Sequence, residues 1–271
     1  MSTLSISIVQ THLDWENKFA NLHRLGERIR GISEKTEIVI LPEMFSTGFS
    51  MNPELLAEEM EGPTIQWMKN IAAEKKIILT GSVIIKEKLQ DSYHYFNRLV
   101  WMLPTGEWGI YNKRHLFAYA GEDEKYTPGD RRFIASVKGW KINLLVCYDL
   151  RFPVWSRQQR RPGEGPVQHE FDLLIYVANW PERRIHAWKT LLQARAIENQ
   201  SYVVGVNRIG EDGNGINYSG DSMIIDPLGE VIHHSNNKEE VFTCHLQKDK
   251  LTEVRSQFPF WLDADHFLIE P

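Results

Sequence analysis

The sequence of 271 residues is poor in cysteine and contains only Cys147 and Cys244. A secreted protein stabilised by disulfides would carry more, so free thiols in a reducing compartment are the simpler interpretation. Residues 1–11 alternate apolar and polar side chains and lack the basic and apolar regions of a signal peptide. No apolar run approaches the ~20 residues that span a bilayer. We therefore expect a cytoplasmic protein without a membrane partner.

Motifs for several other chemistries are missing. The sequence has no Gly-x-Ser-x-Gly of a serine hydrolase, no Gly-x-Gly-x-x-Gly and no Walker loop. Its ten histidines show no His-Glu-x-x-His spacing, and no Cys-x-x-Cys pair is present. A formal net charge of −5 without a basic tract argues against nucleic acid. We expect no cofactor and no metal, and a small molecule as the partner.

The sequence alternates short apolar or alternating runs with amphipathic segments. Hydrophobic residues make up 42% and charged residues 25%, which is typical of a globular protein. No linker or long repeat is visible, which favours one domain over residues 1–271 with a C-terminal extension from about residue 258. A polar segment rich in glycine and proline, residues 158–170, predicts a surface loop.

Helices and strands are expected to alternate, with sheets covered by helices on their outer faces. Apolar stripes predict helices at 14–29, where Asp14 is the expected cap, and at 64–71, 185–199 and 248–257. Strands are predicted at 4–8, 38–41, 77–85, 99–103, 108–111, 133–137, 142–146, 173–177, 202–206, 222–225, 231–233 and 241–245.

Three reactive side chains each follow a predicted strand: Glu43, Lys113 and Cys147. Ligands gather at the carboxyl ends of strands in open α/β sheets, and partial desolvation there makes a carboxylate a better proton acceptor. Taken singly, each has an ordinary explanation as a helix cap, a solvated lysine or a buried free thiol. Together they supply a general base, an oxyanion stabiliser and a nucleophile, the set that acyl transfer requires.

Three segments around these residues, 41–44, 112–117 and 146–153, resemble the signature motifs of the nitrilase superfamily of carbon–nitrogen hydrolases. Segments 178–181 and 193–199 add similarity to its omega-amidase branch. The resemblance extends from Ile6 to about Phe260. It implies an α/β (α+β) fold, a four-layer α-β-β-α sandwich. It also implies hydrolysis of the terminal amide of a 2-oxoacid amide, such as 2-oxoglutaramate or 2-oxosuccinamate, through a thioester.

The resemblance also implies roles for further residues. Glu43, Lys113 and Cys147 correspond to the catalytic residues of the family. The family's second, assisting glutamate falls on Glu122, although Glu124 lies two residues away in the same charged run. The backbone N–H of Tyr148 would be a second oxyanion donor. Members of the superfamily usually form dimers through helices on the outer face, so a homodimer is expected.

Substrate-binding residues are less clearly marked. Phe117 and Trp180 are candidate apolar walls of a pocket, with core packing as the alternative. Arg184 is the candidate receptor for the substrate carboxylate, because a guanidinium binds it with two hydrogen bonds. For Arg151, next to the nucleophile motif, a structural role is favoured. Other amide, N-carbamoyl or nitrile hydrolases remain alternatives, and a non-catalytic binding protein is a distant one.

Overall fold

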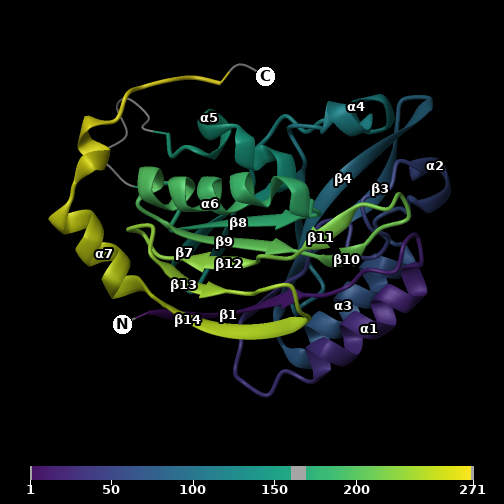
Figure 1. Cartoon of the computed structure of the whole chain (residues 1–271), viewed down its shortest axis with the longest axis horizontal. Helices are drawn as coiled ribbons and strands as arrows, with labels where there is room; N and C mark the ends of the chain where they lie inside the picture. The colour runs from purple at the N-terminus through teal and green to yellow at the C-terminus, as the bar shows by residue number, and fades with distance from the viewer. Residues whose placement is uncertain (1, 160–168, 270–271) are drawn as a thin grey trace.

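The computed structural model describes residues 2–159 and 169–269. Residues 160–168 of the predicted surface loop and residues 270–271 of the predicted extension lie outside this range. Two six-stranded sheets lie face to face at the centre, and helices cover their outer faces (Figure 1). No helix in the described part of the chain has the length and apolar character to cross a membrane.

The first sheet has the strand order β14-β1-β2-β3-β4-β5. Its strands are β1 (Thr3–Gln10), β2 (Ile38–Ile40), β3 (Ile78–Leu89), β4 (Ser92–Met102), β5 (Trp108–Asn112) and β14 (Glu240–Gln247). Helices α1 (Lys18–Arg30) and α3 (Pro63–Lys75) pack on its outer face. The pleat separates the two faces: Ile38 and Ile40 join the core between the sheets, whereas Val39 packs under α1 and α3.

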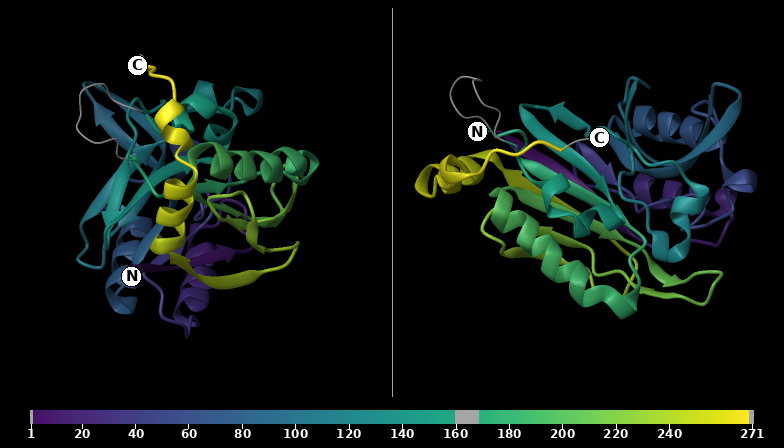
Figure 2. Two further views of the ribbon diagram at one scale, coloured as in Figure 1. Left: turned by 90° about the vertical axis from the view of Figure 1, so that its left-hand side faces the viewer. Right: turned by 90° about the horizontal axis from the view of Figure 1, so that it is seen from above.

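The second sheet has the order β13-β12-β9-β8-β7-β6. Its strands are β6 (Ile134–Val137), β7 (Trp140–Val146), β8 (Leu173–Ala178), β9 (Tyr202–Asn207), β12 (Met223–Ile225) and β13 (Val231–His234). Helix α6 (Ile185–Asn199) covers its outer face (Figure 2). β7, β8 and β9 run parallel and are almost completely buried, as expected for strands covered on both faces.

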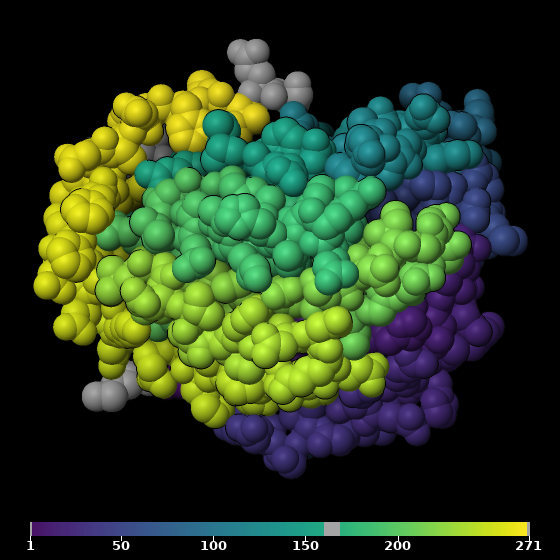
Figure 3. Space-filling model, viewed as in Figure 1, coloured from purple at the N-terminus to yellow at the C-terminus, as the bar shows by residue number. Residues whose placement is uncertain are grey.

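Shorter elements complete the fold. They are α2 (Pro53–Leu56), α4 (Glu122–Lys125), α5 (Pro153–Ser156), α7 (Lys248–Gln257), the hairpin β10 (Ile209–Glu211) and β11 (Asn217–Ser219), and 3-10 turns at Ala118–Ala120, Cys147–Arg151, Glu182–Arg184 and Phe260–Asp263. Helix α7 and the 3-10 turn Phe260–Asp263 lie at one end of the molecule, opposite α2 and α4 (Figures 1 and 3). The predicted layered sandwich is confirmed, and α6 and α7 have the predicted bounds.

The predicted start of the first helix is wrong. Asn17, and not Asp14, is the cap, because its side chain accepts a hydrogen bond from the Ala20 N–H at 3.2 Å. Glu16 has a left-handed backbone (φ 52°), so the chain turns before the helix begins. Phe19, an apolar residue within the predicted helix, is 76% exposed. The helix therefore buries a shorter stripe than the sequence predicted.

Gly205 of β9 allows α6 to approach the second sheet closely. A Cβ atom there would lie 2.5 Å from Leu192 Cδ1 and 2.7 Å from Trp188 Cζ2. We expect Gly205→Ala to lower the free energy of unfolding by about 1–3 kcal/mol, the usual cost of overpacking. Gly31→Ala is the control, since its φ is −69° and its nearest atoms lie at 3.4 Å, and should change stability by less than about 0.5 kcal/mol. Urea unfolding of both variants measures this, and equal losses would contradict it.

Candidate active site

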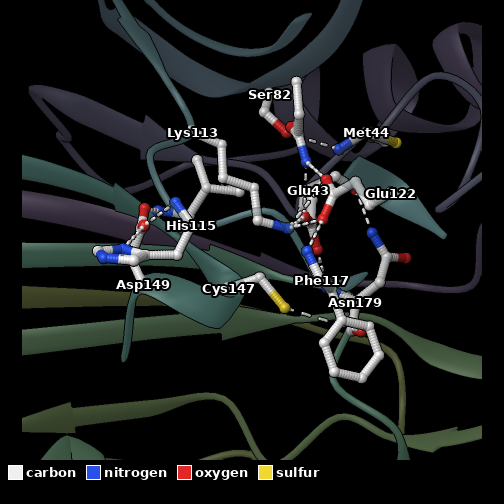
Figure 4. A network of polar contacts seen from close by, with 12 residues as sticks. Glu43, Met44, Ser82, Lys113, His115, Phe117, Glu122, Cys147, Asp149 and Asn179 are labelled. Carbon is white, nitrogen blue, oxygen red and sulfur yellow. Dashed lines mark hydrogen bonds and ion pairs between the residues drawn. The ribbon is translucent and has the colours of Figure 1, made fainter. Parts of the chain in front are cut away.

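The candidate site lies where strand ends of both sheets meet (Figure 4). Lys113 follows β5 and Glu43 lies three residues after β2, both in the first sheet, whereas Cys147 follows β7 of the second. Glu122 is the first residue of α4. The exposed fractions are 0% for both glutamates, 1% for Lys113 and 9% for Cys147. The three residues predicted at strand ends are therefore brought together, and Glu122 joins them.

Lys113 connects the two glutamates. Its Nζ donates to Glu43 Oε1 at 2.9 Å and to Glu122 Oε1 and Oε2 at 3.0 and 2.8 Å. Burial alone would lower the pKa of Lys113, but Glu122 and Glu43 outweigh it and raise that pKa above its ordinary value. Burial raises the pKa of Glu122, and Lys113 opposes the rise. Glu124 is exposed, so Glu122 is the acid of this charged run that contacts Lys113 in the described residues.

Cys147 begins a 3-10 turn with a left-handed backbone (φ 45°), a conformation that costs a non-glycine residue about 1–3 kcal/mol. Its Sγ lies 4.0 Å from the Asn179 carbonyl oxygen. Burial, reinforced by the neighbouring Glu43, raises the pKa of the thiol well above its ordinary value, although Lys113 opposes the shift. The thiol is therefore protonated at neutral pH, and its attack on a substrate needs a base.

Glu43 accepts hydrogen bonds from residues of both sheets. The backbone N–H of Asn179 donates to Glu43 Oε2 at 2.8 Å, and the Asn179 side chain donates to the Glu43 carbonyl oxygen at 2.6 Å. Asn97 of β4 donates to Glu43 Oε1 at 2.8 Å. Asn97 was not predicted from the sequence, because the expected strand begins at residue 99, whereas β4 begins at Ser92. These bonds join Glu43 to both sheets.

Asp149 ties the Lys113 segment to the Cys147 turn. Its Oδ2 accepts hydrogen bonds from the Val146 N–H at 3.0 Å and from the Tyr111 hydroxyl at 2.7 Å. Its Oδ1 accepts one from the His115 N–H at 3.0 Å, and His115 Nδ1 lies 2.8 Å from the same oxygen. The carboxylate is completely buried. It therefore fixes the two segments that carry the ammonium and the thiol relative to each other.

A pocket opens beside Cys147. Its walls are mainly aromatic and apolar, with arginines and a few polar side chains, and include Phe49, Met51, Phe117, Tyr119, Tyr148, Arg151, Trp180, Arg183, Arg184, Asp212, Asn214, Ile216 and Tyr218. All three residues predicted to bind substrate, Phe117, Trp180 and Arg184, line it. The Arg184 guanidinium lies 5.0 Å above the Phe117 ring, and burial lowers its pKa. No carboxylate of the described residues pairs with Arg184.

The hairpin β10–β11 brings four pocket residues that the sequence analysis missed: Asp212, Asn214, Ile216 and Tyr218. Its strands have three residues each, too short for a visible alternation. The turn contains Asp-Gly followed by Asn-Gly, at residues 212–215, which is a recognised hairpin signal. That signal was available in the sequence.

In the part of the chain that the structure describes, no group of three or more His, Cys, Asp or Glu side chains is arranged to hold a metal ion. The arrangement instead offers proton transfer and nucleophilic attack by a thiol. A buried carboxylate can take the thiol proton, and the ammonium can stabilise negative charge on an oxygen atom.

Comparisons with known proteins agree with this chemistry. Residues 5–256 match the model of the carbon-nitrogen hydrolase family. Omega-amidase YafV of Escherichia coli K12 is 41% identical, covering 98% of this chain and 99% of that protein. The 2-oxoglutaramate amidase of Bacillus subtilis is 30% identical over 96% of each chain. The crystal structure of XC1258 from Xanthomonas campestris, a CN-hydrolase superfamily protein with an arsenic adduct in its active site, has a TM-score of 0.93 at 43% identity and covers 100% of both chains.

The chain therefore belongs to the carbon–nitrogen hydrolase family of the nitrilase superfamily. It is a hydrolase that acts on amide C–N bonds. The resemblance inferred from the three sequence motifs is confirmed.

The Asp149 tether gives a testable prediction. Asp149→Ala leaves the Val146 N–H, the Tyr111 hydroxyl and the His115 N–H without their acceptor, and each unsatisfied buried group costs about 1–3 kcal/mol. We expect a loss of about 3 kcal/mol or more in the free energy of unfolding. Asp123→Ala, at an exposed carboxylate, is the control and should change stability by less than about 0.5 kcal/mol. If thermal unfolding found the two variants equally stable, the hydrogen bonds of Asp149 would not contribute to the stability of the fold.

Proposed function

We propose that this hydrolase cleaves the terminal amide of a 2-oxoacid amide, 2-oxoglutaramate or 2-oxosuccinamate, to the 2-oxo dicarboxylate and ammonia. The observation that carries the proposal is the buried Glu43–Lys113–Cys147 cluster beside a mainly apolar pocket, where Arg184 has no carboxylate partner among the described residues. The names of the two relatives, omega-amidase and 2-oxoglutaramate amidase, support the same substrate class.

The proposed reaction has two halves. Glu43 accepts the thiol proton as Cys147 Sγ attacks the amide carbon, and the oxyanion receives hydrogen bonds from the Lys113 ammonium and the Tyr148 N–H. One such donor contributes about 3–4 kcal/mol to transition-state stabilisation. Glu43 then gives its proton to the leaving ammonia, and a thioester remains. Water, deprotonated by Glu43, attacks the thioester and releases the acid, while Glu122 holds Lys113 in place throughout.

The substrate carboxylate is assigned to Arg184. Its guanidinium is partly buried on the pocket wall and has no carboxylate partner within the described residues, so an anionic ligand would restore the missing countercharge. Phe117 and Trp180 would contact the apolar part of the substrate between its charged end and its amide. Arg151 stacks over the Trp180 ring at 4.9 Å, and we keep it in a structural role.

Alternative substrates predict different products. A nitrile hydrolase would release ammonia from a nitrile, and an N-carbamoyl hydrolase would release carbon dioxide together with ammonia. A non-catalytic binding protein would release nothing. We also propose a homodimer and a cytoplasmic location, as expected from the sequence. Analytical ultracentrifugation tests the former and cell fractionation the latter.

The catalytic assignment is tested by substitution. We expect Glu43→Gln, Lys113→Ala and Cys147→Ala each to reduce ammonia release from 2-oxoglutaramate and 2-oxosuccinamate at least about a thousandfold with an intact fold, because each removes the base, the oxyanion donor or the nucleophile. Glutamine, an aliphatic amide and a nitrile complete the substrate panel. Cys244→Ala, at the other cysteine, is the matched control and should retain activity. Full turnover by Cys147→Ala would rule out the mechanism.

The carboxylate assignment predicts a change in KM. Arg184→Ala should raise KM for 2-oxoglutaramate about tenfold or more, since a lost charged hydrogen bond costs about 1.5–3 kcal/mol. Arg184→Lys should fall in between, because it keeps the charge without the planar fork. A neutral aliphatic amide serves as the control and should show the same KM with wild type and variants. Equal KM increases for both substrates would show that Arg184 shapes the pocket and does not bind the carboxylate.

A further inference from the structure

Asn97 of β4 lies inside the buried charge cluster, with an exposed fraction of 1%. Its Nδ2 donates to Glu43 Oε1 at 2.8 Å and to Glu122 Oε1 at 3.1 Å. Its carbonyl oxygen accepts a hydrogen bond from the Lys113 N–H at 3.0 Å. One residue therefore contacts both glutamates through its side chain and the lysine through its backbone.

Few donors serve the two glutamates. The ammonium of Lys113 contacts Glu43 Oε1 and both oxygens of Glu122; when one of its three hydrogens is shared between the two Glu122 oxygens, one hydrogen remains for the substrate oxyanion. The amide of Asn97 has two hydrogens, and one goes to each glutamate. Two buried carboxylates thus share a single ammonium, and Asn97 provides the additional donors without adding charge. A second cation would neutralise the cluster, whereas an amide leaves its charge unchanged.

The orientation of the Asn97 amide follows from its partners. Exchanging the oxygen and nitrogen atoms would place the amide oxygen against two carboxylate oxygens at hydrogen-bond distance, which is electrostatically unfavourable. In the observed orientation Oδ1 has no partner among the described residues. The amide oxygen therefore has no hydrogen bond within the described residues, whereas both N–H groups of the amide donate to the glutamates.

This arrangement distinguishes the two oxygens of Glu43. Oε1 accepts from both Lys113 and Asn97, whereas the hydrogen bond that the described residues give to Oε2 comes from the Asn179 N–H. A carboxylate oxygen has room for about two hydrogen bonds, so Oε2 keeps a free position for the thiol proton. The contact with Asn97 thus determines which oxygen of Glu43 is available to Cys147.

We propose that Asn97 is a positioning residue for the hydrolytic reaction, which orients Glu43 for proton transfer with Cys147 and keeps Glu43 and Glu122 ionised together. This inference rests on the proposed roles of Glu43 and Cys147. Hydrogen bonds to the charged form of a carboxylate favour that form, and the two N–H groups of Asn97 act on both glutamates at once.

The groups that set the ionisation of this cluster come from several elements. Lys113 after β5 is the cation, and Cys147 after β7 is the neighbouring thiol. Tyr126, after α4, faces Glu122, and burial together with that glutamate raises the pKa of its hydroxyl. The Tyr126 hydroxyl donates to the Ser50 carbonyl oxygen. Asn97 is the neutral side chain that touches both glutamates.

The test compares Asn97→Asp with Asn97→Ala. Aspartate has nearly the shape of asparagine but replaces two donors by a third negative charge, whereas alanine removes the donors and leaves space. If Asn97 acts as a donor, Asn97→Asp is the more damaging change. We expect kcat to fall about a hundredfold, with KM changed less. The pH at which kcat falls to half its maximum on the acid side should rise by about one unit. If Asn97 only fills space, Asn97→Asp is the milder change and the pH profile does not move.

A second measurement needs no substrate. Iodoacetamide alkylation of Cys147, followed by peptide mass spectrometry across pH, reports the thiol directly, and Cys244 is the internal reference. The added charge in Asn97→Asp disfavours the thiolate, so alkylation of Cys147 should slow about tenfold near neutral pH while Cys244 is unaffected. Asn199→Asp, at the last residue of α6, is the matched control, since Asn199 is also buried, with an exposed fraction of 2%, and its hydrogen bonds go to Gln158 and Arg195. It should lower stability without moving either pH profile.

The outcomes separate the two proposals. Wild-type activity and an unchanged alkylation profile in a folded Asn97→Asp variant would overturn the role of Asn97 and leave the proposed function standing. Absence of turnover by wild type on every substrate, together with altered Cys147 alkylation in Asn97→Asp, would overturn the proposed substrate and support Asn97. If Asn97→Asp does not fold, Asn97→Ala still decides: a higher acid limb of its alkylation profile supports the donor role, and an unchanged limb overturns it.

Discussion

The ammonium of Lys113, buried between the carboxylates of Glu43 and Glu122, is the interaction on which the rest of the site depends. Removing an ion from water costs several kcal/mol even after relaxation, and the cost is recovered only with good geometry and further hydrogen bonds. Here the partners come from β2, β5 and α4, so the charges are satisfied only when these elements have assembled. Asn97 and Asn179 complete the hydrogen bonding from β4 and from the end of β8.

The two carboxylates share the Lys113 ammonium, and the Cys147 thiol lies beside them. Burial, reinforced by Glu43, raises the pKa of this thiol, although Lys113 opposes the shift. The pocket wall carries three arginines, Arg151, Arg183 and Arg184, and one carboxylate, Asp212. The proposed substrate, with an anionic end and a neutral amide end, would be oriented by this excess of positive charge.

The sequence predicted the layers of the fold and the placement of three reactive side chains after strand ends. Continuous apolar runs identified β7 and β8, and helical periodicity located α6. Glu122 was different, because its charged neighbours at 123–125 are typical of exposed surface and only the family resemblance singled it out. It is buried because the preceding turn directs it at Lys113, and the Phe117 N–H fixes one of its oxygens at 2.6 Å.

Asn97 marks the limit of local inference. Its side chain reaches Glu43 and Glu122, which are 54 and 25 positions away, and the bond from Asn179 to Glu43 spans 136 positions. Alternation along β4 tells which face a residue occupies, but it does not tell whether that face meets water or a carboxylate. Glu43, Lys113 and Asn97 all belong to the first sheet, whereas the contact from Asn179 to Glu43 joins this sheet to the second. The charge cluster thus requires the first sheet and α4 to be in place, and docking of the second sheet adds the Asn179 contact and brings Cys147 beside Glu43.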